Sequence, residues 1–213
     1  MGHDHRIVKS YFPGGACQWI VYLRQMGETG QILLPSVIVV TGRPGSGKTT
    51  LAHLLAKAVW CPAICRDEIK EGLVNTTGEL ADPTADPARR AYEIFFDTLQ
   101  LLLSRSVTLV AEAAFQHKLW APKLEPLRDI ARIRIIHCHI DPQLARSRHI
   151  ERGLADPARE RFHPDAVIQA AREGRALPID EYDPPHLDVP TLMVDTSAGY
   201  QPAFDEIALF AGG

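Results

Sequence analysis

The sequence lacks long apolar runs, and no stretch approaches the roughly 18 residues that a membrane-spanning helix requires. Residues 1–6 are polar and no sustained apolar segment follows them, so we expect no secretory signal. Internal repeats and low-complexity tracts are also missing. From these absences we expect a cytoplasmic protein with no membrane partner.

A strong charge of either sign is missing too. The 23 Lys and Arg residues nearly balance the 26 Asp and Glu residues, for a net charge of −3 at pH 7. Bulk electrostatics therefore give no reason to expect nucleic acid as a partner, although a local basic groove stays open.

Cysteine is scarce, and the four cysteines match no zinc motif in their spacing. Cys61 and Cys65 form the one close pair and have no second pair to match. In the expected strand Ile133–Ile140, alternation sends Cys138 to one face of the sheet and its histidine neighbours to the other. We expect buried, reduced thiols, and no metal site at Cys138 and its histidine neighbours.

The chain has the size and composition of one globular domain. Its 213 residues are 46% hydrophobic and 23% charged, which is enough to build a core. Residues 1–36 carry no recognisable chemistry and are expected to form an N-terminal extension. Residues 37–213 are expected to form the domain.

The clearest motif is GRPGSGKT at Gly42–Thr49, which fits the phosphate-binding loop pattern G-x-x-x-x-G-K-[ST] at every fixed position. An apolar strand, Val37–Thr41, precedes it and a helical pattern, Gly47–Val59, follows. Glycines let backbone N–H groups turn toward phosphate oxygens, and the helix adds its positive end. We expect Lys48 to reach the β- and γ-phosphates of ATP and the Thr49 hydroxyl to bind Mg²⁺. The predicted nucleotide-binding residues are Gly42, Arg43, Pro44, Gly45, Ser46, Gly47, Lys48, Thr49 and Thr50.

Strands alternate with helices along the rest of the domain, which indicates an α/β fold with a parallel sheet and helices on both faces. The helix after the second strand is expected to stop near Gly72, before a loop at Asn75–Pro87. A further loop is expected at Ala155–Pro164. The expected strands are Val37–Thr41, Ala63–Cys65, Val107–Ala111, Ile133–Ile140 and Thr191–Asp195.

Ligands in such sheets bind at the carboxyl ends of the strands, where Asp67 and Glu112 stand. Asp67 could accept a proton from an acceptor hydroxyl or simply cap its helix. Lys70, one turn later, could pair with Asp67, hold the acceptor or be solvated. Glu112 could support Mg²⁺, hold the acceptor or serve the structure.

An arginine-rich segment at about 143–164 is interpreted as a lid over the phosphates. Arg148 and Arg152 lie one helical turn apart and are predicted to share a face that stabilises the transferring charge. Arg159 and Arg161 follow in the expected loop. The alternative is a solvated helix face balanced by nearby carboxylates.

The order of these motifs resembles the small P-loop kinase family labelled "AAA domain", with phage polynucleotide kinase, zeta toxins and chloramphenicol phosphotransferase as relatives. The resemblance covers about 37–210. It implies a five-stranded sheet of order 2-3-1-4-5 and ATP-dependent transfer to a hydroxyl, with Asp67 as the general base. Lys70 stands where the polynucleotide kinase motif has an arginine. Glu112 is the nearest substitute for a Walker B aspartate.

The sequence therefore predicts a kinase that transfers the γ-phosphoryl group of MgATP to a small-molecule or nucleoside-type acceptor. An ATPase or nucleotide switch with a protein partner is one alternative, and a polynucleotide 5′-hydroxyl kinase is another. The sequence does not name the acceptor or the oligomeric state.

Overall fold

The structure, a computed structural model, describes residues 34–77 and 86–213. The expected extension at 1–36 falls almost wholly outside the described residues, and so does most of the loop expected at 75–87. No helix in the described ranges is both long and apolar enough to span a bilayer.

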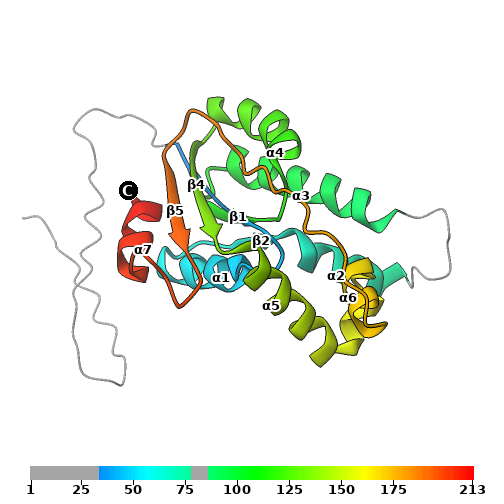
Figure 1. Cartoon of the computed structure of the whole chain (residues 1–213). Helices are drawn as coiled ribbons and strands as arrows, with labels where there is room; N and C mark the ends of the chain where they lie inside the picture. The colour runs from blue at the N-terminus through cyan, green and yellow to red at the C-terminus, as the bar shows by residue number, and fades with distance from the viewer. Residues whose placement is uncertain (1–33, 78–85) are drawn as a thin grey trace, which may run out of the picture. The chain divides into compact units, whose positions relative to one another are not determined.

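Five parallel strands form one sheet of order β2-β3-β1-β4-β5, which confirms the expected strand order (Figure 1). Every residue of the central strand β1 is buried, because both faces of the sheet are covered. The strands are β1 (Ser36–Gly42), β2 (Ala63–Cys65), β3 (Leu109–Glu112), β4 (Arg132–His139) and β5 (Thr191–Asp195).

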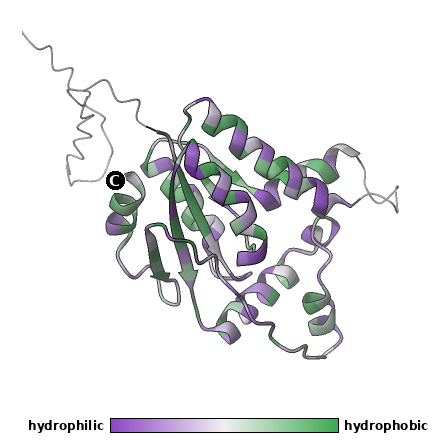
Figure 2. Ribbon diagram, turned by 90° about the horizontal axis from the view of Figure 1, so that it is seen from above, coloured by the Kyte–Doolittle hydropathy of each residue, from purple (hydrophilic) through white to green (hydrophobic). Residues whose placement is uncertain are grey.

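Helices cover the two faces of the sheet as two separate layers (Figure 1). On one face, Leu51 and Leu55 of α1 (Lys48–Ala58) and Ile207 of α7 (Phe204–Gly212) pack in one core cluster. On the other face, aromatic and aliphatic side chains of α3 (Pro87–Ser104) and α4 (His117–Leu124) pack in a second cluster. Figure 2 shows the hydrophobic strands enclosed by helices that also carry hydrophilic residues.

The segments that build the site flank the carboxyl edge of the sheet. They are α2 (Arg66–Thr77), α5 (Pro142–Ala155), the 3-10 helix η3 (Pro157–Arg161) and α6 (Ala166–Arg172). A second 3-10 helix, η2 (Glu125–Asp129), leads into β4. Part of the loop expected at Ala155–Pro164 is therefore η3.

The end expected for α2 near Gly72 is wrong, because the helix continues to Thr77. A glycine inside a helix costs only about 1 kcal/mol. Ile69 packs against the core cluster under α3 and Val74 is buried, and this packing offsets the cost. Tertiary contacts thus override the local signal at Gly72.

The expected alternation in β4 is confirmed. Cys138 is buried in the cluster under α1. The His137 ring lies on the other face, 5.8 Å from the ring of Tyr182. Of the cysteines in the described ranges, Cys61, Cys65 and Cys138 are all free thiols.

Candidate active site

The phosphate-binding loop connects the end of β1 to the start of α1. Gly47 has φ 77° at the N-cap of α1, and no side chain caps this helix end. Gly45 has φ 84°, and a Cβ there would lie 2.0 Å from the carbonyl oxygen of Ala145 in α5. The glycines therefore let the loop pass beneath α5 and leave the first N–H groups of α1 without a side-chain acceptor. Such N–H groups bind anions.

Ser46 adds a second unsatisfied polar group to the loop. Its Oγ is buried and has no hydrogen-bond partner among the described residues. Buried hydroxyls normally have a partner, and the described residues do not supply one to this atom. The loop thus fits an anionic ligand by both its backbone and this side chain.

Lys48 and Glu112 form a buried pair beneath the loop. Glu112 ends β3, in register with Val40 of β1 on one side and Cys65 of β2 on the other. Its Oε1 lies 3.7 Å from the Nζ of Lys48, and both side chains are less than 10% exposed. Thr49 also hydrogen-bonds to the Glu112 carboxylate.

Burial raises the pKa of Glu112, and the nearby charge of Asp67 adds to this, while Lys48 and the Thr49 hydrogen bond act against it. Positive charge near Glu112, from Lys48 or from a bound cation, favours its ionised form. Thr49 and Glu112, the two predicted metal ligands, are close enough to bind the same cation.

Asp67 stands in the first turn of α2, directly after β2. Arg66 donates a hydrogen bond of 3.0 Å to its Oδ1. Enclosure in the site would raise the pKa of Asp67, but the Arg66 hydrogen bond and the charges of Lys48 and His163 outweigh it and lower the pKa. Asp67 is therefore ionised at neutral pH and can accept a proton or a hydrogen bond.

A pocket of about 470 Å³ opens between the phosphate-binding loop, α2 and the α5–α6 segment. Pro44, Lys48, Thr49 and Thr50 line one side and Asp67 and Lys70 another. The facing wall includes Arg152, Arg159, His163 and Arg172.

Two clusters of polar contacts hold this facing wall in place. Glu71 of α2 pairs with His163, at 2.8 Å from Nε2, and with Arg159, at 3.6 Å. His149 of α5 pairs with Asp165 at 2.8 Å. Asp165 also caps α6. The first cluster ties η3 to α2, and the second ties α5 to α6.

Arg152 faces the pocket from α5. Burial and the charge of Arg159 lower the pKa of Arg152, whereas the carboxylates of Asp67, Glu112 and Glu71 raise it. An arginine stays protonated under all these influences. The guanidinium thus places a permanent positive charge opposite Lys48.

The structure does not bring every predicted residue to this pocket. Arg148 donates to the carbonyl oxygens of Thr196 and Ser197, after β5, and does not line the pocket. The expected shared face of Arg148 and Arg152 is therefore wrong: the two long side chains diverge from neighbouring turns. Arg43 donates to the carbonyl oxygen of Asp180 instead of entering the pocket.

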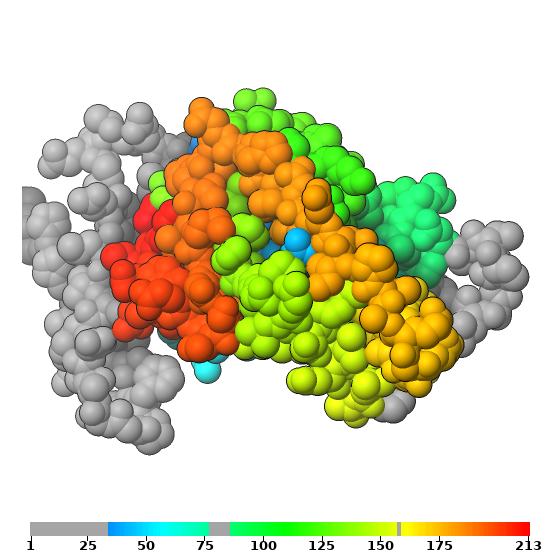
Figure 3. Space-filling view, in the orientation of Figure 1, coloured from blue at the N-terminus to red at the C-terminus, as the bar shows by residue number. Residues whose placement is uncertain are grey.

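Arg146, as expected, points elsewhere and bonds to the carbonyl oxygens of Leu177 and Pro178. The segment that accepts these bonds lies across the molecule beside α5, as its orange atoms show in Figure 3. Arg43 and Arg146 thus hold residues 177–180 over the carboxyl edge of the sheet.

Sequence reasoning missed Arg66 and Glu71. Arg66 carried a signal, since it directly precedes Asp67 at the end of β2. Its guanidinium also donates to the carbonyl oxygen of Ala88. Glu71 carried none, because its partners lie about 90 residues away in the sequence.

Comparison with known proteins agrees with this geometry. A protein from Chloroflexus aurantiacus J-10-fl, described as a candidate kinase, has a similar structure with 25% sequence identity and a TM-score of 0.62. The match covers 83% of this chain and 96% of that one.

Two further solved structures share the fold. The Mycobacterium tuberculosis APS kinase CysC, in complex with AMPPNP and APS, matches with 17% identity, a TM-score of 0.51 and coverage of 84% and 95% of the two chains. A chain of the Pnkp1/Rnl/Hen1 RNA repair complex matches with 16% identity and a TM-score of 0.51, over 72% of this chain and 51% of that one.

No curated protein matches the sequence. A family model described as "AAA domain" matches residues 37–178, which is more than half of the chain. The match includes the phosphate-binding loop, Asp67, Glu112 and the α5 helix. The chain therefore belongs to the AAA domain family of P-loop, kinase-like proteins.

Proposed function

We propose that this protein is an ATP-dependent kinase that phosphorylates a hydroxyl group of a small-molecule or nucleoside-type acceptor. One observation carries the proposal: a single pocket is lined by Lys48 and Thr49 of the phosphate-binding loop, by ionised Asp67, and by Arg152 from the facing wall. A phosphoryl donor, a base and cations are the parts that phosphoryl transfer requires.

Nucleotide binding is supported by the loop itself. The uncapped start of α1 and the unpartnered Ser46 hydroxyl both fit phosphate oxygens. Thr49 and Glu112 would hold Mg²⁺, directly or through its water shell, and the bound MgATP would supply an activated γ-phosphoryl group. Lys48 would lie at the phosphates, with Glu112 fixing its position from below.

Asp67 would act on the acceptor. Its lowered pKa keeps the carboxylate ionised, so an acceptor hydroxyl in the pocket can donate its proton to Asp67 as the oxygen bonds to phosphorus. The bond between the γ-phosphorus and the β–γ bridging oxygen breaks, and ADP leaves. Arg66 would orient the Asp67 carboxylate through their ion pair.

The α5–α6 segment would serve as the lid. Arg152 and Arg159 bring positive charge to the side of the pocket opposite the loop, where they can stabilise charge on the transferring group. Pocket residues continue to Arg172, so the lid we propose would extend beyond the boundary expected near residue 164. Lys70, on α2, would contact the acceptor.

The test is transfer of radiolabelled γ-phosphate from ATP to a panel of nucleosides, sugars, antibiotics and 5′-hydroxyl oligonucleotides. Asp67→Asn should lower transfer by about 10²- to 10⁴-fold and leave nucleotide affinity unchanged. Asp97→Asn, an exposed change on α3, is the matched control. If ATP hydrolysis runs at full rate without acceptor and Asp67→Asn has no effect, the chain is an ATPase or switch, and the proposal fails.

A further inference from the structure

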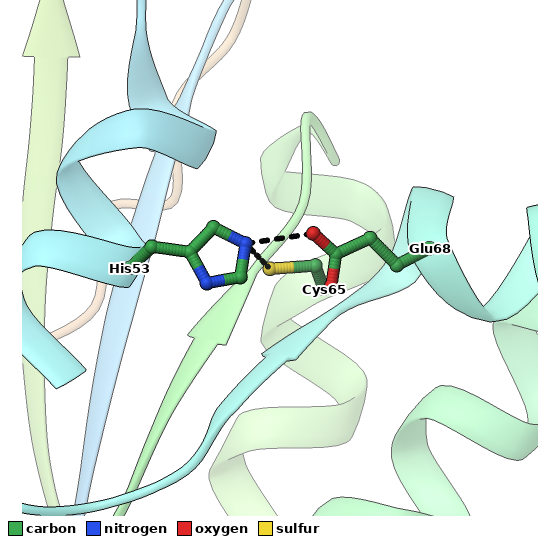
Figure 4. Close-up of side chains that lie close together, drawn as sticks. All are labelled: His53, Cys65 and Glu68. Carbon is green, nitrogen blue, oxygen red and sulfur yellow. Dashed lines mark hydrogen bonds and ion pairs between the residues drawn. The ribbon is translucent and has the colours of Figure 1, made fainter. Parts of the chain in front are cut away.

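Three side chains with metal-binding atoms meet beside the pocket, and each comes from a different element (Figure 4). His53 lies on α1, Cys65 ends β2, and Glu68 lies in the first turn of α2. Their ligand atoms all lie within 4.8 Å of one another. The proposed nucleotide-binding and catalytic residues do not include any of the three.

The contacts converge on one atom. The Nε2 of His53 lies 2.7 Å from Oε1 of Glu68 and 3.7 Å from Sγ of Cys65. In a Cys–His–carboxylate relay, the thiol and the carboxylate use different nitrogens of the imidazole. A nucleophilic relay is therefore excluded here, because both groups face the same nitrogen.

A shared cation would account for the convergence. We propose that His53, Cys65 and Glu68 bind a divalent transition-metal ion of the zinc class. Imidazole nitrogen, thiolate sulfur and carboxylate oxygen are the ligands that Zn²⁺ takes, whereas Mg²⁺ prefers oxygen alone. This donor set also separates the ion from the Mg²⁺ expected at Thr49 and Glu112.

The surroundings allow the site to close around an ion. Cys65 is buried, and its register with Glu112 fixes the position of its backbone. The side chains of His53 and Glu68 are each about half exposed, which leaves them room to adjust. Cys65 and Glu68 line the pocket, so water can reach a fourth coordination position. The carboxylate of Glu112 beside the thiol adds negative charge that a cation would offset.

An ion at this position would join α1 to the first turn of α2. Asp67 is the residue before Glu68, so the metal would restrict the backbone that carries the proposed base. The site itself does not depend on the proposed kinase activity, and it can be tested by metal binding alone.

The experiment is a Co²⁺ titration of the full-length, chelator-treated protein, followed by absorbance. Co²⁺ in a tetrahedral site with a cysteine ligand gives a thiolate-to-metal charge-transfer band in the near ultraviolet and strong d–d bands in the visible. We expect both bands, and we expect Zn²⁺ to displace Co²⁺ and abolish them.

Variants assign the ligands. Cys65→Ser should abolish the charge-transfer band, and His53→Gln or Glu68→Gln should weaken Co²⁺ binding by at least about 10-fold, the loss seen even for groups that only support a ligand. His53 and Glu68 are partly exposed, so these two variants keep the test valid if Cys65→Ser fails to fold. Circular dichroism checks the fold of each.

Cys61→Ser and Cys17→Ser are the matched controls and should retain the band. Cys17 and the histidines His3 and His5 lie outside the described residues, so these controls separate the site from binding near the N-terminus. No charge-transfer band in the wild-type protein, or a band that survives in folded Cys65→Ser, would overturn the proposal. Unchanged Co²⁺ affinity in both His53→Gln and Glu68→Gln would overturn it as well.

Discussion

The Nζ of Lys48 lies 3.7 Å from Oε1 of Glu112, and this ion pair is buried where the phosphate-binding loop meets β3. The pair joins the nucleotide half of the site to the centre of the sheet. Each charge compensates the other at a buried position, where an unpaired charge would be costly.

Separating the pair should destabilise the fold. We expect Lys48→Met or Glu112→Gln alone to lower the free energy of unfolding by about 3 kcal/mol, because each leaves one buried charge unpaired. Burial already raises the pKa of Glu112, so this residue can take up a proton when Lys48 is replaced. Protonation should keep the stability loss of Lys48→Met from exceeding about 3 kcal/mol. Urea unfolding of the singles and the double variant measures the coupling. A double variant whose loss equals the sum of the singles would show that the pair does not interact.

The two predicted lid arginines should behave differently. Arg152→Ala should lower phosphoryl transfer by about 10²-fold, because it removes a positive charge from the pocket that we propose binds the phosphates. Its free energy of unfolding should change by no more than about 0.5 kcal/mol. Arg148→Ala should instead lower stability by about 1.5–3 kcal/mol, because two carbonyl oxygens lose a charged donor. Turnover assays and thermal unfolding of both variants test this. A large loss of activity in Arg148→Ala together with a large loss of stability in Arg152→Ala would contradict the prediction.

The Glu71 cluster should control the opening of the lid. Glu71→Gln weakens the contacts to Arg159 and His163, so η3 should detach from α2 more often. A loss of about 1 kcal/mol corresponds to about 5-fold faster tryptic cleavage at Arg159 and Arg161. Mass spectrometry of the fragments measures this rate. Glu173→Gln, which removes an exposed pair with Arg175, should leave the rate unchanged.

Acid should destabilise the domain through His137. Burial and the neighbouring charges of His139 and Arg43 lower the pKa of His137 to about 4. The unfolded chain binds this proton near pH 6.5, so stability is complete above that pH and is lost as the pH falls toward 4. His137→Gln should reduce the loss of unfolding free energy between pH 7 and pH 5 by about 1–2 kcal/mol. Urea unfolding at several pH values measures this loss. Equal slopes of unfolding free energy against pH for wild type and variant would contradict the prediction.

The sequence predicted those parts of the site that depend on local signals. Gly42–Thr49 has a fixed pattern, and Asp67 and Glu112 follow apolar strands directly. In a parallel sheet, strand ends converge on one edge, so these residues had to meet. The end of α2 was not predictable in this way, since packing of Val74 overrides Gly72.

The failures concern long side chains and distant partners. A helical period places Arg148 and Arg152 on one face, but a guanidinium reaches far enough for each to find its own acceptor. His53, Cys65 and Glu68 show no motif spacing, because each belongs to a different element. Only the positions of α1 and α2 at the edge of the sheet bring them together.

By itself, the sequence determined the class of fold, the phosphate-binding loop and the carboxylates that follow the strands, because each is encoded by neighbouring residues and by a strand or helix period. Tertiary structure alone decided which arginine faces the pocket, how Glu71 pairs with Arg159 and His163, and where three metal-binding side chains meet. These features depend on contacts between residues far apart in the chain, and no local pattern records them.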